Sequence, residues 1–267
     1  MHIGKKEEMR IDKIAKMGKD ISSENMREKK ERKKPEKPKE KSRFVKDLIE
    51  AVFLALFIIS FMVVFVLFFK PLFYLDIKLF HLEDAAGINA DQIRKNYSVL
   101  ISYFAFWNRG KLLLPDFRMS ESGRIHFEDC KKIFDQVQYL FIGSGVLLAV
   151  FFMIRKKRTK DDIEDRSGQA KLFSSGMLLI SGFLLTGIPA LIGLMALIDW
   201  ERLFVSFHRL FFSNDYWLFD PATDPVILIL PDGFFFQCLA VILVLVIGSG
   251  LICIARAIKI RKADKYG

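Results

Sequence analysis

Long apolar runs alternate with charged segments along this chain, and four of the runs are long enough to cross a bilayer. The first, residues 51–69, contains a single polar residue, Ser60. At a rise of about 1.5 Å per residue it forms a helix of about 28 Å, close to the ~30 Å hydrocarbon core. The other runs are residues 137–154, 172–198 and 234–255. The pattern predicts an all-α membrane protein with four transmembrane helices.

The lengths of the runs indicate how each one fits the membrane. Residues 172–198 must tilt, kink at Pro189 or extend past the hydrocarbon, because the run is longer than a bilayer requires. Glycines in this run and in residues 137–154 permit close packing between helices. The first apolar run begins at residue 51 and is too long for a signal-peptide core, so we expect no cleavable signal peptide.

The segments between the runs alternate in charge. Their net charges, in chain order, are +7 for residues 1–47, zero for 71–136, +3 for 155–171, −4 for 199–233 and +4 for 256–267. Positive segments stay on the cytoplasmic side of a membrane. We therefore expect both termini and the central loop to be cytoplasmic, and the two longer loops, 71–136 and 199–233, to be structured and to face outward.

Composition supports this organisation. The chain has 267 residues, of which 52% are hydrophobic and 27% charged, and it carries a net charge of +10. Such segregated charge excludes an ordinary soluble globule, and three cysteines exclude a disulfide-stapled secreted domain. The basic run 28–43 lacks the interleaved aromatics of a nucleic-acid arm. We expect no nucleic-acid partner and three regions: a disordered cytoplasmic tail (1–47), a membrane domain (48–258) and a basic cytoplasmic tail (259–267).

The first outer loop contains a helix signature. Asn89 and Gln92 have the spacing of a capping box, in which each side chain bonds the backbone of the other. Apolar residues follow at helical spacing: Ile93, Tyr97, Leu100, Ile101 and Phe104. This pattern predicts either an amphipathic helix at the outer membrane surface or a small cap packed on the spans.

A second helix is predicted to open near Ser120 and to continue through His126 into the second span. His126, Asp129 and Cys130 lie on one face of it, at spacings of three and four residues. A carboxylate at Asp129 could fix the tautomer and the orientation of His126.

The second outer loop combines aromatic and polar residues. The aromatic stripe consists of Trp200, Phe204, Phe207 and Phe211, with His208 and Phe212 beside it. Asn214, Asp215, Trp217, Asp220 and Asp224 follow it. Such a stripe is typical of interfacial anchoring. Histidine and acidic groups beside membrane-facing aromatics also suggest chemistry on an amphiphile.

Common catalytic motifs are absent from the sequence. It contains no HExxH, CxxC, GxSxG, SxxK or glycine-rich phosphate loop. Three interpretations stay open at this point. His126, His208 and an acidic residue could hold a metal ion, Cys130 could be a nucleophile or a small apolar filler, and the histidines could act as acid and base.

Two segments resemble the lipoprotein intramolecular transacylase (Lit) family. One is WERLFVSFHRLFFSNDYWLFDP, residues 200–221, which continues to Asp224-Pro225 and Leu230-Pro231, and the other is HFEDCKKIF, residues 126–134. The likeness covers most of residues 45–260. The chain departs from the family pattern at Phe127 and Cys130, where methionine and valine are usual. Residues 80–84 also resemble family members, without implying a catalytic role for His81.

The resemblance implies an enzyme of the bacterial cell membrane. It would move the sn-2 acyl chain of a diacylglyceryl-modified lipoprotein cysteine to the α-amino group of that cysteine, giving a lyso-form lipoprotein. We expect no metal and no cofactor, and the partners are the lipoprotein substrate and membrane lipid. His126 and His208 would be the base and the acid, in either order.

Other residues are predicted to support the two histidines. Asp129, Asn214 and Asp215 are candidates for orienting a histidine or stabilising an oxyanion. Candidates for lining the substrate site are Phe204, Phe207, Phe211, Phe212, Trp217 and Asp220. Two alternative functions remain, a metal-dependent membrane hydrolase and a non-enzymatic scaffold or receptor.

Overall fold

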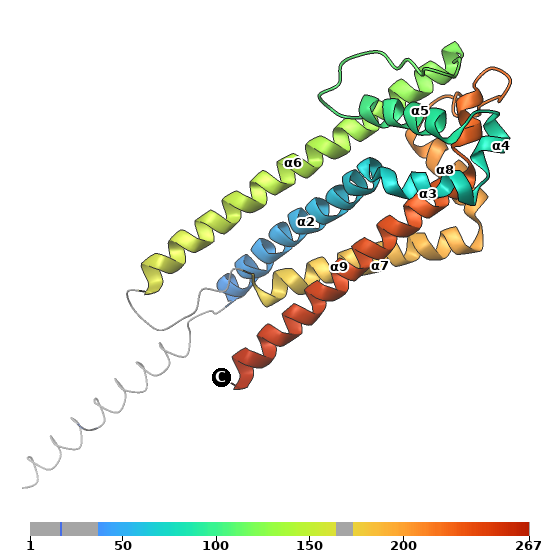
Figure 1. Ribbon diagram of the computed structural model, residues 1–267. Helices are drawn as coiled ribbons and strands as arrows, with labels where there is room; N and C mark the ends of the chain where they lie inside the picture. Colours follow the sequence, from blue (N-terminus) through green and yellow to red (C-terminus); the bar gives the residue numbers. More distant parts are fainter. Residues whose placement is uncertain (1–16, 18–36, 164–172, 267) are drawn as a thin grey trace, which may run out of the picture. The chain divides into compact units, whose positions relative to one another are not determined.

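The computed structural model describes residue 17, residues 37–163 and residues 173–266, and all of its regular secondary structure within these ranges is helical (Figure 1). The chain divides into two compact units, residues 1–46 and residues 47–267. The helices in chain order are α2 (Lys37–Phe68), α3 (Lys70–Leu79), α4 (Leu82–Ala86), α5 (Ala90–Tyr103), α6 (Glu121–Ile163), α7 (Ser175–Ile198), α8 (Trp200–Phe211), the 3-10 helix η1 (Pro225–Ile229) and α9 (Asp232–Tyr266).

Four of these helices, α2, α6, α7 and α9, are long and apolar enough to cross a membrane, as the sequence predicted. Two boundaries differ from the prediction. Residues 37–47, assigned to the N-terminal tail, belong to α2, and α9 runs to Tyr266, so the last basic segment continues the fourth span as a helix. The remainder of the predicted tail, apart from residue 17, lies outside the described residues.

The third and fourth spans cross at two glycines. A Cβ atom on Gly182 of α7 would lie 2.9 Å from the carbonyl oxygen of Gly250 on α9, and a Cβ on Gly250 would lie 3.0 Å from the carbonyl oxygen of Gly182. The two backbones can approach this closely only because both side chains are absent. Close packing was expected from the glycines of the second and third spans. Gly145 of the second span fits this expectation, because a Cβ there would lie 3.1 Å from the Phe57 ring of α2, whereas a Cβ on Gly143 would meet no atom within 4 Å.

The first two spans pack through aromatic rings and a buried ion pair. Phe57 of α2 stacks on Phe141 of α6 with ring centroids 5.3 Å apart. Towards the far end of α6, the Arg155 guanidinium pairs with the buried Glu50 carboxylate and lies 3.8 Å from Asp47. The α7 N-cap residue, Ser174, donates a 2.6 Å hydrogen bond to Asp47 and so joins α7 to this group.

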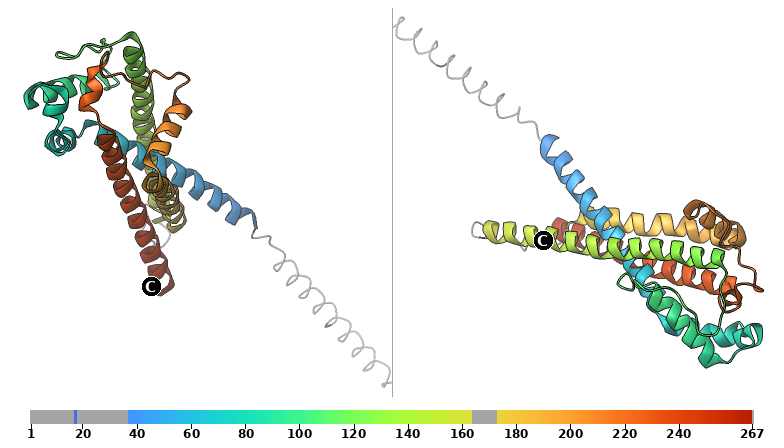
Figure 2. Two further views of the ribbon diagram at one scale, coloured as in Figure 1. Left: turned by 90° about the vertical axis from the view of Figure 1, so that its right-hand side faces the viewer. Right: turned by 90° about the horizontal axis from the view of Figure 1, so that it is seen from above.

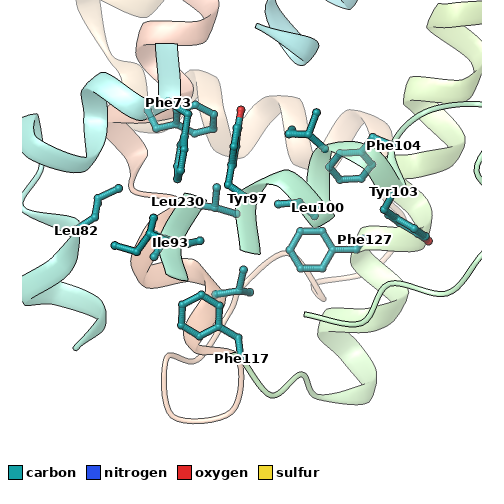
Figure 3. Close-up of a cluster of buried hydrophobic side chains, with 14 of the residues drawn as sticks. Phe73, Leu82, Ile93, Tyr97, Leu100, Tyr103, Phe104, Phe117, Phe127 and Leu230 are labelled. Atoms are coloured by element: carbon teal, nitrogen blue, oxygen red, sulfur yellow. The ribbon is translucent and has the colours of Figure 1, made fainter. Parts of the chain in front are cut away.

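The two longer connecting segments, residues 69–120 and 199–231, gather at one end of the long helices (Figures 1 and 2). Their core is a cluster of apolar side chains from α3, α4, α5, η1 and the start of α9 (Figure 3). Phe73 stacks on Tyr97 with centroids 3.6 Å apart, and Phe234 meets both rings edge-on. The capping box of Asn89 and Gln92 is confirmed. Since the apolar face of α5 is buried in this cluster, the structure favours a cap packed on the spans.

The carboxylate of Asp224 joins the two longer connecting segments. Asp224, which is 2% exposed, accepts a 2.7 Å hydrogen bond from the backbone N–H of Ser120, directly before α6. A Cβ on Gly123 would lie 2.2 Å from the same carboxylate oxygen, so a side chain is excluded there. The predicted helix from Ser120 through His126 into the second span is confirmed as α6. Asp224 therefore fixes the start of α6 against the segment that follows α8.

Candidate active site

The two histidines named by the sequence meet where α6 and α8 come together. His126 of α6 and His208 of α8 have ring centroids 6.0 Å apart. They are 6% and 9% exposed, respectively. His126 precedes the apolar stretch 137–154, in the charged first part of α6, so both rings lie outside the apolar parts of the spans. The pair is shielded from solvent, a condition that strengthens hydrogen bonds and charge interactions.

The tautomer of His208 follows from one hydrogen bond. Its Nδ1 lies 2.8 Å from the carbonyl oxygen of Phe204, one helical turn earlier. Because a carbonyl oxygen can only accept, Nδ1 carries the hydrogen, and in the neutral ring Nε2 is an acceptor. Burial lowers the pKa of His208, and the hydrogen bond to Phe204 partly opposes this effect. His208 therefore presents a neutral ring with one free lone pair.

His126 is more deeply desolvated. Its Nε2 lies 3.3 Å from the Sγ atom of Cys130, while its Nδ1 is buried without a hydrogen-bond partner. Burial lowers the pKa of His126 to about 4; the nearby His208 acts in the same direction, and the negative charge of Asp129 opposes it. His126 is consequently neutral at physiological pH.

Aromatic rings surround the pair. Phe212 and Phe219 meet the His126 ring edge-on, with centroids 4.9 and 5.4 Å away. Trp217 stacks on the His208 ring at 4.7 Å with 29° between the planes. The Nε1 atom of Trp217 is buried and has no hydrogen-bond partner. These rings restrict the access of water to both imidazoles.

A cavity of about 220 Å³ adjoins the histidines. Its walls come from α2, α5, α6, α8 and α9 and from the segment between α8 and α9, and they are almost entirely apolar. The lining residues are Val63, Val66, Leu67, Tyr97, Leu100, Ile101, Phe104, His126, Phe127, Phe134, His208, Phe219, Ile227, Leu230, Phe234, Phe235, Cys238 and Ile242. Two neutral imidazoles at the edge of an apolar cavity can handle a proton beside a bound hydrocarbon chain.

Comparisons with known proteins agree with the resemblance seen in the sequence. The model of the family "Lipoprotein intramolecular transacylase Lit" matches residues 48–235. The chain belongs to the Lit family.

Solved structures of Lit from Bacillus cereus are similar to this family member. One of them, an in meso structure, has 32% sequence identity to this chain and a TM-score of 0.72. The match covers 83% of this chain and 96% of the other. Two others carry a histidine replaced by arginine or by alanine. The arginine variant has 30% identity, a TM-score of 0.68 and coverage of 85% and 95%. The alanine variant has 31% identity, a TM-score of 0.68 and coverage of 83% and 94%.

Comparison with curated proteins gave no match. Family membership and the similar structures support a lipoprotein intramolecular transacylase activity in general, in a protein that crosses the membrane several times.

Asp129 and Asp215, which were expected to support the histidines of this Lit family member, make no hydrogen bond with either ring. Asp129 accepts hydrogen bonds from Lys132 at 2.8 Å and from the Asn214 amide at 3.3 Å, and it makes none with His126. A spacing of three residues places the carboxylate beside His126, but its two partners turn it away from the ring. Asp215 is exposed and has no side-chain bond within the described part of the chain.

The aromatic candidates divide into two groups. Phe204, Phe212 and Trp217 contact the histidine rings without lining the cavity. Phe207 and Phe211 are 45% and 51% exposed and pack on each other, with centroids 4.7 Å apart, and Phe207 also meets the His208 ring edge-on at 5.5 Å. Asp220 is also exposed, and its carboxylate accepts a turn hydrogen bond from the Ala222 N–H. The structure therefore brings Phe207, Phe211 and Asp220 to the surface rather than into the cavity.

Several wall residues in this Lit family member were not recognised as site residues from the sequence. Tyr97 and Leu100 were assigned to the apolar face of a loop helix, and Phe234 and Cys238 to the fourth span. The available signal was the apolar face of the helix at residues 90–103, because an apolar helix face is buried against other apolar residues. Phe219 lies within a segment that resembles the family, so the resemblance could have indicated it, whereas Phe127 stands where the chain departs from the family pattern.

The alternative chemistries find little support in the geometry. Within the described ranges, no group of three or more His, Cys, Asp or Glu side chains is arranged to hold a metal ion. Cys130 is buried, and burial raises the pKa of its thiol to about 12, with the charge of Asp129 adding to the effect. A thiol with such a pKa is protonated and weakly nucleophilic at neutral pH.

Proposed function

We propose that this protein transfers the sn-2 acyl chain of a diacylglyceryl lipoprotein cysteine to the α-amino group of the same cysteine. The observation that carries the proposal is the buried histidine pair at the edge of an apolar cavity. The apolar cavity can hold the acyl chain, and an imidazole can accept the proton that must leave the nitrogen. Because both reacting groups belong to one molecule, the enzyme has only to hold them in reacting geometry.

The low histidine pKa values indicate which form of the amine reacts. An α-ammonium group has a pKa of about 7.7–8.0, whereas the pKa of His126 is about 4. Proton transfer from the ammonium to His126 would be unfavourable by about 5 kcal/mol, at ~1.4 kcal/mol per unit. Releasing the proton to water at pH 7 costs only about 1 kcal/mol. The substrate therefore reacts as the free amine.

Attack of the free amine on the ester carbonyl makes the nitrogen positively charged and acidic. We assign the removal of this proton to Nε2 of His208, because the bond from Nδ1–H to Phe204 leaves Nε2 as an acceptor. The protonated pair then returns the same proton to the departing glyceryl oxygen. The carbonyl–oxygen ester bond breaks, an amide bond forms, and both histidines end neutral.

The sequence left the order of the two roles open, and we assign the base to His208 and the donor to His126. The fixed tautomer of His208 supports this order. His126, kept neutral by burial, is suited to donate a hydrogen bond to an ester oxygen, as neutral imidazoles do in other enzymes.

We also propose that the site faces outward from a bacterial cell membrane. The basic segments that flank the spans support this orientation. Along the chain, each adjoins the end of a span that is farther from His126 and His208. An exported lipoprotein would meet the site on that side.

The test is the form of the lipoproteins produced by a host that expresses the protein. We expect His126→Gln and His208→Gln to abolish N-acylated lyso-form peptides in mass spectra while both variants still accumulate in the membrane. His81→Asn is the matched control, because His81 is exposed and asparagine tolerates its positive φ of 51°. Unmodified amines in cells with the wild-type protein, or active histidine variants, would contradict the proposal.

A further inference from the structure

We propose that the indole N–H of Trp217 donates a hydrogen bond to the carbonyl oxygen of the ester under attack and stabilises the oxyanion that forms there. This inference rests on the proposed function, since it assigns an additional group to the same reaction. It concerns a donor that the structure leaves unused, beside the ring that accepts the proton.

Trp217 holds one of two unpaired ring nitrogens near the site. Among the described residues, the buried side-chain nitrogens without a hydrogen-bond partner are Nε1 of Trp217 and Nδ1 of His126. Both belong to rings in contact with His208. Buried polar groups are nearly always paired, and exceptions are frequent in catalytic sites. An indole nitrogen can only donate, so its missing partner must be an acceptor.

The position of the ring limits what that acceptor can be. Trp217 stacks on His208 with centroids 4.7 Å apart, and His208 lines the cavity. His208 takes the proton from the nitrogen that attacks the carbonyl carbon, so this carbon and its oxygen must lie close to the imidazole. A donor on the adjoining ring is therefore near the oxygen on which negative charge develops.

Several donors of the segment that follows α8 are already engaged. The Asn214 amide, the oxyanion donor expected from the sequence, bonds Asp129 through its nitrogen and accepts from the Tyr216 N–H through its oxygen. The backbone N–H of Phe212 bonds the carbonyl oxygen of His208 at 2.8 Å, and that of Leu218 bonds the carbonyl oxygen of Asp215 at 3.1 Å. The Trp217 indole is buried and unpaired, so it could serve the substrate without breaking an existing bond.

Replacing Trp217 by phenylalanine tests the role of the N–H, because an aromatic ring is kept. We expect Trp217→Phe to lower kcat by about 10- to 1000-fold on a dipalmitoylglyceryl-cysteine peptide, with KM changed less than threefold. Trp200→Phe is the matched control. It also removes an indole N–H, but Trp200 packs on Phe204 and Phe236 and not on a histidine, so its kcat should equal that of the wild type.

A second measurement separates the donor role from a structural one. A phosphonate replacing the sn-2 ester mimics the tetrahedral intermediate, and we expect Trp217→Phe to weaken its binding at least tenfold and leave substrate binding nearly unchanged. Equal losses for both compounds would indicate a structural role and overturn the inference. If the variant fails to fold, the inference can be tested on the wild-type protein by NMR of its ¹⁵N-labelled indole groups. The Trp217 N–H signal should move downfield on phosphonate binding, and an unmoved signal overturns the inference.

The outcomes distinguish this inference from the proposed function. A Trp217→Phe variant with wild-type kcat, alongside an inactive His208→Gln variant, refutes the role of the indole alone. An active His208→Gln variant refutes the proposed function itself.

Discussion

At the scale of single residues, burial determines the charge of the two histidines. Both lie among aromatic rings, and the loss of hydration lowers the pKa of each. Desolvation disfavours the charged imidazolium, so the pair rests in its neutral form. The substrate amine titrates at about 7.7–8.0, whereas the pKa of each imidazole lies below its usual value.

This arrangement predicts the pH dependence of the reaction. We expect kcat/KM on a lipopeptide to fall about tenfold per pH unit below the amine pKa of about 7.7–8.0. No further break should occur near pH 6.5, where an exposed histidine would titrate. The measurement is a pH–rate profile between pH 5 and 9 in detergent or vesicles. A slope that steepens to two below pH 6.5 would show that a histidine with an ordinary pKa is required.

The same pKa shift predicts an effect on stability. Because the pKa of His126 is lower in the folded protein than in the unfolded chain, the neutral ring contributes stability above about pH 6.5. That contribution, about 3 kcal/mol for a shift of this size, is lost as the pH falls from 6.5 to about 4. We expect the decrease in Tm across this window to be smaller for His126→Gln than for the wild type. Parallel decreases would contradict the assigned shift.

The sequence identified His126 and His208 but not the details of their surroundings. Residue type and family likeness are visible in a sequence, whereas the bond from His208 to Phe204 depends on a rotamer. The same is true of Asp129, whose spacing places it beside His126 although its carboxylate is bonded to Lys132 and Asn214. The unpaired nitrogen of Trp217 could not be inferred for the same reason.

At the scale of elements, the helices follow their sequence signals closely. The capping box begins α5, and α6 continues from Glu121 through the second span without a break. The apolar face of α5 allowed two interpretations because a hydrophobic stripe does not reveal what covers it. Only the fold shows that Phe73 and Leu230 pack on it (Figure 3). Phe234 also meets the ring of Tyr97 on this face.

The glycine crossing of α7 and α9 gives a prediction for stability. We expect Gly250→Ala to destabilise the protein by about 1–3 kcal/mol, because the added Cβ lies 2.9 Å from the Cβ of Leu185 and forces the helices apart. Gly248→Ala is the control, since no atom lies within 4 Å of its Cβ position. Both substitutions replace glycine by alanine within α9, so they raise the helix propensity by the same amount. Thermal unfolding in one detergent compares them, and equal Tm values would show that the crossing adapts to the methyl group.

At the scale of the whole molecule, the cavity arises from segments that are distant in sequence. Its walls combine the first span, the cap helix α5, the start of α6 and the fourth span. The sequence predicted the four spans from their hydropathy, because each span is a local feature. The cavity depends on how the spans and the cap pack together, and no local pattern records that.

If the cavity holds the transferred acyl chain, filling it should change which chains are accepted. We expect Val63→Phe to lower activity on long-chain substrates more than on short-chain ones, because Val63 lines the cavity from α2. Val64→Phe is the matched control, since Val64, the next residue on the same helix, does not line the cavity. Rates on lipopeptides with acyl chains of increasing length provide the measurement. An equal loss at every length would place the chain elsewhere.

The two histidines belong to different pairs of helices. His126 lies on α6, which is joined to α2 through Phe57, Phe141 and Arg155. His208 follows directly from α7, which is locked to α9 at the glycine crossing, with Asp199 alone between α7 and α8. The bonds of Asp129 to Asn214 and of Ser120 to Asp224 hold the pairs together beside the site. The candidate active site therefore lies at the contact between the two helix pairs, so the spacing of the two imidazoles depends on the contacts between the pairs, including those of α2 with α7 and α9.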